Sequence, residues 1–382
     1  PPAPRPRARH PGMRLLLTHG TATVRDQATA LFTECDVQVW QPWDTPGAVQ
    51  RFLAQFQPRV GLLMETEVWP NMVALCRQAG VHLCLVNARM SEKSMRSALR
   101  LRWLSRPAYA GLHTVLAQTE DDAKRLRALG ATVQAVTGNL KFDATPDAAL
   151  LARGRAWRAG SAKPVLMFTS SREGEEQMLI DALKATPLAA VQWLIVPRHP
   201  QRFDEVAELF KKNSLNFVRR SSLLKKCVEK REREAKEDAT QTVQIVRQVA
   251  DDAGDKVIVN PHISFVLGDS MGEMFTYYAS CDVAFIGGSL LPLGGQNLIE
   301  ACSMGKPVLI GPHTFNFEQA TEMAITAGAA QRVHDSSDLA QHLQALFADN
   351  DKQRTMSAAA LRFSNQSRGA TQRTLNLLSQ FI

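Results

Sequence analysis

The chain has 382 residues, of which 45% are hydrophobic and 21% are charged, and its formal net charge is +8. This composition excludes disordered and fibrous proteins, and the length predicts two domains that each bury their own core. No apolar run is long enough to span a membrane. The modest positive charge is compatible with a nucleic acid, an anionic membrane surface or an acidic substrate as partner.

The six cysteines are scattered, without a C-x-x-C pair and without a histidine at zinc-binding spacing. This pattern predicts buried free thiols in a reducing compartment and no metal centre.

The first part of the chain predicts an α/β domain. Residues 1–12 are rich in proline and arginine and are expected to be a tail that does not pack. From residue 13 to 145, short apolar runs alternate with segments of helical length, which predicts βαβ units and a parallel sheet. The strands are expected at Arg14–Leu17, Val37–Trp40, Val60–Met64, His82–Val86, Thr114–Ala117 and Gln134–Thr137, and helices at Thr23–Phe32, Pro46–Phe56, Asn71–Ala79 and Glu120–Ala128.

A second α/β domain is expected over residues 146–355, after a polar linker. Two such halves place the expected active site in the cleft between them. Residues 356–382 close the chain with a helical segment. The strands of the second domain are expected at Val165–Phe168, Val191–Val196, Val257–Val259, Ser264–Val266, Val283–Ile286 and Val308–Ile310.

A charged insertion over residues 219–256 interrupts the second domain. Its first part, residues 219–238, carries eight basic and five acidic residues in mixed order. Mixed charges of this kind are typical of solvated helix faces. A nucleic-acid site would carry interleaved aromatic residues, which this run lacks, so no nucleic-acid partner is expected.

The stretch from Val283 to Phe317 predicts a phosphate- and sugar-binding edge of the second sheet. An apolar strand ends at Gly287-Gly288-Ser289, a second glycine pair follows at Gly294-Gly295, and a helix is expected after Asn297. Glycine lets backbone N–H groups approach an anion, and a helix N-terminus favours phosphate. The carboxylate of Glu300 would accept hydrogen bonds from ribose hydroxyls. Glycine pairs also occur in ordinary tight turns.

Two carboxylates follow the predicted strand Val60–Met64. On an extended backbone Glu65 and Glu67 would point to one face, at the carboxyl end of a parallel strand, where such sheets bind ligands. The alternative is a helix-entry loop with two solvated acids.

A basic run extends from Arg89 to Arg106, with six basic residues and a single acid. Arg89, Lys93, Arg96 and Arg100 have the spacing of one helical face. A solvated face would normally mix charges, so this run predicts contact with a phosphorylated lipid or an anionic membrane surface.

Two polar loops complete the predicted edge of the second sheet. Ser170 and Ser171 follow one strand and precede a helix, so their hydroxyl and N–H groups could bind an anion. Arg198 and His199 follow the next strand, and arginine is a natural bidentate partner of phosphate.

These motifs resemble those of one enzyme family. GGSLLPLGGQNLIEA, from residue 287, and GPHTFNF, from residue 311, are similar to the donor-site signature of 3-deoxy-D-manno-octulosonic acid (Kdo) transferases, which are GT-B glycosyltransferases. METEVWPN, over residues 64–71, also matches a motif of that family. This sequence departs from the family pattern in two places. Gln296 stands where the family usually has histidine, and the histidine that the family usually has near Arg172 is absent.

The resemblance implies an inverting transfer of Kdo from CMP-Kdo to a phosphorylated lipid A precursor, in lipopolysaccharide core biosynthesis at the cytoplasmic face of the bacterial inner membrane. It implies a GT-B fold, with an acceptor-binding Rossmann-like domain over 13–145, a donor-binding one over 146–355, and a C-terminal helix over 356–382 that crosses back. No metal or other cofactor is expected.

The resemblance also assigns the site residues. Either Glu65 or Glu67 orients the acceptor, with Glu67 preferred, and Arg89, Lys93, Arg96 and Arg100 face the lipid. The donor contacts are expected from Ser170, Ser171, Arg198, His199, Gly272, Glu273, Met274, Gly287, Gly288, Ser289, Gly294, Gly295, Asn297 and Glu300. His313, Asn316 and Phe317 complete the rim.

The start of the chain differs from the family pattern. Family members begin with a membrane-anchoring segment and a strand that ends in a Gly-Glu pair, whose glutamate is the general base. The first strand of this chain resembles their second, so the first domain is expected to lack its N-terminal strand and the general base. Loss of such a base costs about 10²–10⁴-fold in rate, which predicts CMP binding with little Kdo transfer.

Two alternatives remain open. The first is a GT-B nucleotide-sugar epimerase, and the second is a nucleotide-sugar-binding protein without activity.

Overall fold

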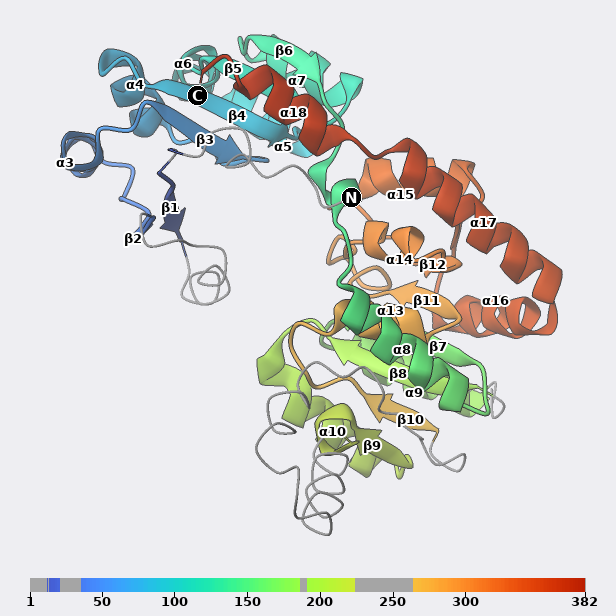
Figure 1. Cartoon of the computed structure of the whole chain (residues 1–382). Helices are drawn as coiled ribbons and strands as arrows, with labels where there is room; N and C mark the ends of the chain where they lie inside the picture. The colour runs from blue at the N-terminus through green and yellow to red at the C-terminus, as the bar shows by residue number, and fades with distance from the viewer. Residues whose placement is uncertain (1–11, 13, 21–35, 186–190, 224–263, 382) are drawn as a thin grey trace. The chain divides into compact units, whose positions relative to one another are not determined.

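The computed structural model describes residues 12, 14–20, 36–185, 191–223 and 264–381. The chain divides into two compact units (Figure 1): residues 1–143 with 367–382, and residues 144–366. The predicted N-terminal tail, the predicted helix Thr23–Phe32, the predicted strand Val257–Val259 and most of the charged insertion lie outside the described residues.

The first unit contains a four-stranded parallel sheet in the order β3-β4-β5-β6. The two central strands, β4 and β5, are buried on both faces, as is usual for continuous apolar runs. The strands are β3 (Val60–Met64), β4 (His82–Ala88), β5 (Thr114–Ala117) and β6 (Val133–Val136), and the helices are α3 (Pro46–Phe56), α4 (Pro70–Gln78), α5 (Glu92–Arg100), α6 (Arg102–Ala110), α7 (Glu120–Ala128) and α18 (Ala370–Leu378).

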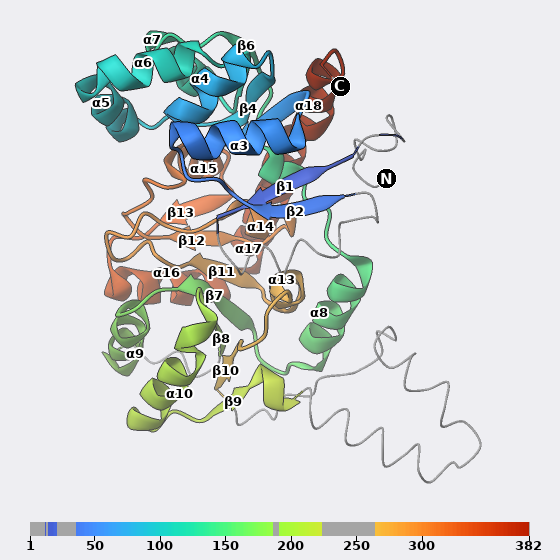
Figure 2. The ribbon, with the colours of Figure 1, turned by 90° about the vertical axis from the view of Figure 1, so that its left-hand side faces the viewer.

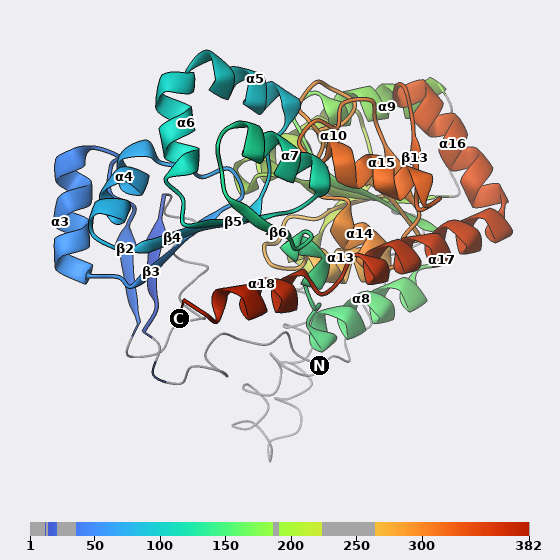
Figure 3. The same ribbon diagram turned by 90° about the horizontal axis from the view of Figure 1, so that it is seen from above.

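Alternate residues of β4 face the two sides of this sheet. Leu83 and Leu85 pack in a core with residues of α3, α4 and α7, whereas Cys84 and Val86 pack against Leu378 of α18. Figure 3 shows α18 along one side of the sheet and α4, α6 and α7 along the other. The last helix is therefore part of the first unit.

The strands β1 (Leu16–His19) and β2 (Val37–Trp40) do not continue this sheet, contrary to the sequence-based expectation. They form a separate parallel pair (Figure 2). Val37 and Trp40 are 45% and 51% exposed, and Leu62 of β3 is 48% exposed. Because these side chains are exposed, no common hydrophobic face covers β2 and β3, and the two strands belong to separate sheets.

The closing helical segment is two helices rather than one. α17 (Asn350–Gln366) belongs to the second unit, and only α18 belongs to the first. Between them Gly369 adopts φ +92°, a conformation that favours glycine. The Asp143 carboxylate accepts hydrogen bonds from the N–H groups of Gly369 and Thr371, at 2.6 and 2.5 Å. These bonds fix the start of α18.

The second unit is built on a seven-stranded parallel sheet in the order β13-β12-β11-β7-β8-β10-β9. Its strands are β7 (Val165–Ser171), β8 (Gln192–Pro197), β9 (Phe217–Arg219), β10 (Phe265–Leu267), β11 (Val283–Ile286), β12 (Val308–Ile310) and β13 (Ala330–Arg332). Its helices are α8 (Ala148–Gly160), α9 (Glu175–Ala185), α10 (Phe203–Lys212), α13 (Met274–Ser280), α14 (Ile299–Ser303), α15 (Glu318–Thr326), α16 (Ser336–Ala348) and α17.

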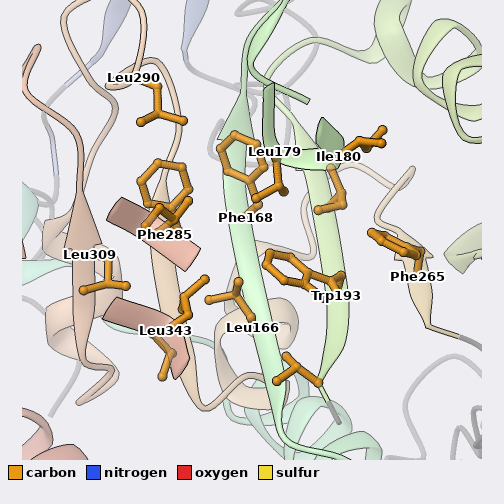
Figure 4. Packing of buried hydrophobic residues seen from close by; sticks show 14 of the residues in the cluster. Leu166, Phe168, Leu179, Ile180, Trp193, Phe265, Phe285, Leu290, Leu309 and Leu343 are labelled. Carbon is orange, nitrogen blue, oxygen red and sulfur yellow. The ribbon is translucent and has the colours of Figure 1, made fainter. Parts of the chain in front are cut away.

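The core of this unit follows from the alternation of side chains along its strands. Phe168, Trp193, Phe265 and Phe285 come from four neighbouring strands and lie on one face, together with Leu343 of α16 (Figure 4). Because this face is fully buried, the ends of the strands are held rigidly, and the loops at their carboxyl ends have a fixed base.

The four cysteines among the described residues are free and buried, as predicted. Burial raises the pKa of Cys76 and Cys84 to about 11. In the second unit, burial raises the pKa of Cys281 and Cys302 to about 12.

Candidate active site

The carboxyl ends of β7, β8, β10, β11 and β12 lie at one edge of the second sheet, because all of these strands are parallel. In open α/β sheets this edge is where ligands bind. The strand ends, loops and helix starts at this edge carry the donor residues expected from the sequence. The structure shows which of their polar groups are open and which are already used within the protein.

The glycine loop after β11 does not present a free cradle of N–H groups. The carboxylate of Glu175, in the first turn of α9, accepts hydrogen bonds from the N–H groups of Gly288 at 2.7 Å and Leu290 at 3.0 Å. It also accepts one from the N–H of Arg172 at 3.0 Å. Burial raises the pKa of Glu175, while these N–H groups oppose the rise. The expectation that this loop binds phosphate through its backbone is therefore wrong for these two N–H groups.

Close backbone packing explains two of the glycines instead. A Cβ on Gly287 would lie 2.5 Å from the carbonyl oxygen of Ser170, and one on Gly311 would lie 2.3 Å from that of Ser289. Any side chain at these positions would push neighbouring strand ends apart. The glycine pattern is thus required for packing, whatever the loop binds.

Three serines expected at the donor are buried. The hydroxyl of Ser289 donates to the carbonyl oxygen of Ile286 and accepts a hydrogen bond from the N–H of Gly311. The hydroxyl of Ser171 donates to Glu176 at 2.6 Å. Ser170 is 7% exposed and has a left-handed backbone, with φ +54°. The hydroxyls of Ser171 and Ser289 are used inside the protein, so their assignment as donor contacts is not supported.

Open positive charge lies at the ends of β7 and β8. Within the described residues the guanidinium groups of Arg172 and Arg198 have no hydrogen-bond or ion-pair partner. The positive charges of Arg172, Arg198 and Arg202 act on His199. Its pKa is lowered first by partial burial and then by these three charges. Arg202 is occupied, because it pairs with Glu176 at 2.8 Å. Two free guanidinium groups beside a histidine form a site for an anion.

Arg172 and Gln296, the two departures from the family pattern, lie at the same place. A Cβ on Gly288 would lie 3.5 Å from the Cγ atom of Arg172 and 3.2 Å from the Nε2 atom of Gln296. Sequence reasoning treated these positions separately. Their shared neighbour shows that both changes affect one point of the edge.

Asn297 and Glu300 lie at the start of α14 and are half-buried. The side chain of Asn297 accepts a hydrogen bond from the N–H of Ile299 at 3.0 Å and donates to the Glu300 carboxylate at 3.1 Å. Asn297 therefore fixes the start of the helix and the position of Glu300. The predicted role of Glu300 toward ribose hydroxyls stays a prediction.

The turn after β10 contains Gly272 and Glu273, and Met274 begins α13. Glu273 is buried and pairs with Arg220, a residue that sequence reasoning placed in a solvated run. Burial alone would raise the pKa of Glu273, but Arg220, with help from Ser270 and Arg153, holds it below the usual value. The mixed charges around Arg220 gave no signal that this one arginine is buried.

In the first unit, Glu65 and Glu67 do not lie on an extended backbone. Glu65 has φ +55°, and the N–H of Glu67 donates to the carbonyl oxygen of Met64 at 3.0 Å, which closes a turn. The prediction that both acids point to one face of a strand is therefore wrong. Glu65 pairs with Lys141 at 2.8 Å. Glu67 is exposed and, within the described residues, has no partner, so it is the carboxylate that is free to meet a ligand.

The basic run forms two short helices rather than one face. α5 begins at Glu92, capped by the hydroxyl of Ser91, so Arg89 precedes the helix and follows β4. Lys93, Arg96 and Arg100 do lie on α5, and all three are exposed. Figure 3 shows α5 and α6 at the periphery of the first unit.

Among the described residues, no group of three or more histidine, cysteine, aspartate or glutamate side chains is placed to hold a metal ion. None of the helices in the described ranges combines the length and the apolar composition needed to cross a membrane.

Comparison with known proteins gives a consistent result. A family model described as "3-Deoxy-D-manno-octulosonic-acid transferase (kdotransferase)" matches residues 4–144. The 3-deoxy-D-manno-octulosonic acid transferase of Bordetella pertussis is 43% identical over 383 residues, which cover 97% of this chain and 82% of the relative. The enzyme of the same name from Haemophilus influenzae is 28% identical, over 98% of this chain and 81% of the relative.

The solved structures show the fold. The UDP-GlcNAc 2-epimerase of Neisseria meningitidis, bound to UDP-GlcNAc, matches with a TM-score of 0.59 at 14% identity, covering 98% of this chain and 94% of that one. Because its identity is so low, this likeness supports the GT-B fold and says nothing of the reaction.

Proposed function

The chain belongs to the Kdo transferase family, and we propose that it transfers Kdo from CMP-Kdo to a phosphorylated lipid A precursor at an anionic membrane surface. The main support for this reaction is the 43% identity, over nearly the whole chain, with the 3-deoxy-D-manno-octulosonic acid transferase of Bordetella pertussis. The epimerase alternative rests on likeness of fold alone. An assay of Kdo transfer to the lipid distinguishes this function from that of an inactive nucleotide-sugar-binding protein.

The donor brings two negative groups to the second unit, the phosphate of CMP and the carboxylate of the Kdo sugar. Arg172 and Arg198 follow neighbouring strands, and their guanidinium groups have no partner among the residues that the structure describes. Arginine binds both phosphate and carboxylate in a bidentate manner. We expect these two residues to hold the donor and to stabilise CMP as it leaves, without requiring a metal.

In the reaction, the bond between the anomeric carbon of Kdo and the phosphate oxygen breaks, and an acceptor hydroxyl oxygen takes its place with inversion. The bond electrons leave with CMP, and the acceptor proton passes to a carboxylate base, a role for which Glu67 is available among the described residues. Glu67 is exposed and unpaired within the described residues, whereas Glu65 is held by Lys141. We therefore assign acceptor orientation to Glu67.

The surface of α5 and α6 suits an anionic membrane. α5 buries none of its residues, and Arg96, Arg100, Arg102 and Arg106 are exposed. Beside these charges Trp103 is 73% exposed and Leu101 is 53% exposed. Exposed tryptophan and leucine next to arginine are typical of helices that lie in a membrane interface. We place this surface on the cytoplasmic face of the bacterial inner membrane.

The function is tested in two steps. Calorimetry with CMP and with UMP examines the donor, and we expect CMP to bind more tightly. Incubation with CMP-Kdo and a phosphorylated lipid A precursor, followed by mass spectrometry of the lipid, examines transfer. A lipid heavier by Kdo supports the proposal. Equal binding of UMP would contradict the donor, and CMP binding with no Kdo on the lipid would favour the inactive alternative.

A further inference from the structure

The beginning of the charged insertion contains a buried cation. Arg220 directly follows β9, and its side chain is 1% exposed. Its guanidinium group donates from Nη2 to Oε1 of Glu273 at 3.1 Å and from Nε to Oε2 at 3.3 Å. The group also lies over the ring of Trp157, with its central carbon 5.1 Å from the ring centroid. A buried charge needs such compensation, so this arginine has a specific structural task.

That task concerns the turn from Asp269 to Glu273, between β10 and α13. The Asp269 carboxylate accepts hydrogen bonds from the N–H and the hydroxyl of Ser221, at 2.8 and 2.7 Å. The hydroxyl of Ser270 donates to the Glu273 carboxylate. Two residues at the entry of the insertion, Arg220 and Ser221, therefore hold the turn through its side chains.

The other side of this turn is open. Gly272 has φ +79°, and a Cβ added to it would meet no atom within 4 Å. The next residue along the open rim, Met271, is 56% exposed. At the same edge, a Cβ on Gly287 or Gly294 would meet atoms at 2.5 and 2.3 Å. The backbone at Gly272 is thus accessible to a ligand in a way that these other glycines are not.

We propose that Arg220 is a positioning residue of the nucleotide site, which holds Glu273 and through it the Ser270–Gly272 backbone in the conformation that receives CMP. This inference rests on the proposed function, because it takes CMP as the ligand of the turn. Arg220 is too deeply buried to touch the donor itself. It acts through Glu273: without Arg220 the carboxylate would lose its bidentate partner and keep only the more distant Arg153, at 3.8 Å, and Ser270 would lose its fixed acceptor.

A purely structural role would give a different result from a positioning role. Arg158 provides the matched control, because it also pairs with an acid of the second unit, Asp282, at 2.9 Å. Asp282 directly precedes β11, at the amino end of the sheet and away from the donor loops. Arg158→Met should lower the melting temperature and leave CMP affinity unchanged.

The experiment measures CMP affinity by calorimetry and the melting temperature for Arg220→Met, Arg220→Lys and Arg158→Met in the whole chain. We expect Arg220→Met to weaken CMP binding about tenfold to a hundredfold, and Arg220→Lys to recover part of the loss, since lysine keeps the charge without the bidentate geometry. The double variant Arg220→Met/Glu273→Met removes both charges, so it should recover stability without recovering affinity. It replaces the single variant if that one fails to fold.

The outcomes distinguish failure of the role proposed for Arg220 from failure of CMP as the donor nucleotide. If Arg220→Met, or the double variant, binds CMP as tightly as the native chain while its melting temperature falls as in Arg158→Met, Arg220 is only structural and the inference is overturned. If the native chain itself does not bind CMP, the proposed donor fails, and the inference fails with it. Loss of affinity confined to the Arg220 variants supports the inference.

Discussion

Replacing Glu175 by alanine tests how the donor edge of the second unit is held together. Its carboxylate is 0% exposed and joins the loop after β7 to the glycine loop after β11 through three backbone N–H groups. The residue lies 113 positions before Gly288 in the chain, so the variant removes a long-range tie and leaves the local sequence of the loop intact.

The magnitude follows from the groups that lose their acceptor. Each buried N–H without a partner costs about 1–3 kcal/mol, so three of them, partly relieved by relaxation, predict a loss of about 3–5 kcal/mol in the free energy of unfolding. In a unit of this size 1 kcal/mol lowers the melting temperature by about 2–4 °C, which predicts a fall of about 10 °C. CMP affinity should fall as well, because the loops that carry Arg172 and Gln296 would lose their common anchor.

Glu173→Ala is the control for this measurement. Glu173 is exposed, lies in the same loop and carries the same charge. Urea denaturation followed by fluorescence gives the free energy of unfolding for the native chain and both variants. A Glu175→Ala variant within about 0.5 kcal/mol of Glu173→Ala would refute the reasoning, because surface substitutions already produce changes of that size.

Three further predictions concern the donor, the membrane and pH. Glu300→Ala should weaken CMP binding by about 1–3 kcal/mol if its carboxylate holds the ribose hydroxyls, and unchanged calorimetric affinity in a folded variant would remove Glu300 from the site. Arg96→Glu/Arg100→Glu should abolish sedimentation with anionic vesicles while CMP binding persists; Lys124→Glu/Arg127→Glu on α7 has the same charge change and should still bind the vesicles. The pKa of Glu273 is lowered in the folded chain, so its contribution to stability is present above its unfolded pKa near 4.5 and is lost as pH falls through the folded value. Urea titrations of the native chain and Glu273→Gln should therefore converge at low pH, and a constant difference would contradict this assignment.

Sequence reasoning located the central strands because they are buried on both faces. Thr114–Ala117, Val283–Ile286 and Val308–Ile310 were predicted with the bounds that the structure shows. The edge strand Val60–Met64, which is partly exposed, was also predicted with its observed bounds. A continuous apolar run is the signature of such a strand. The two edge strands of the second sheet, β9 and β13, were not predicted, because an edge strand of three residues such as Ala330–Arg332 carries no apolar run.

The site was harder to predict because its chemistry depends on distant partners. The glycine loop resembles an anion cradle in sequence, but Glu175 occupies two of its N–H groups. Arg220 looks like one charge among many until Glu273 and Trp157 surround it. In both cases a local pattern predicts a residue's environment poorly, since the deciding contact lies at least 50 positions away along the chain.

The four buried thiols allow the unfolding of each unit to be measured separately. Cys76 and Cys84 lie in the first unit, and Cys281 and Cys302 lie in the second. Since their pKa values are raised to about 11 and about 12, a labelling reagent at neutral pH reacts with them chiefly when the surrounding structure unfolds. In a Cys35→Ser/Cys227→Ser background, mass spectrometry of the labelled peptides would report the unfolding free energies of the two units separately, in one sample.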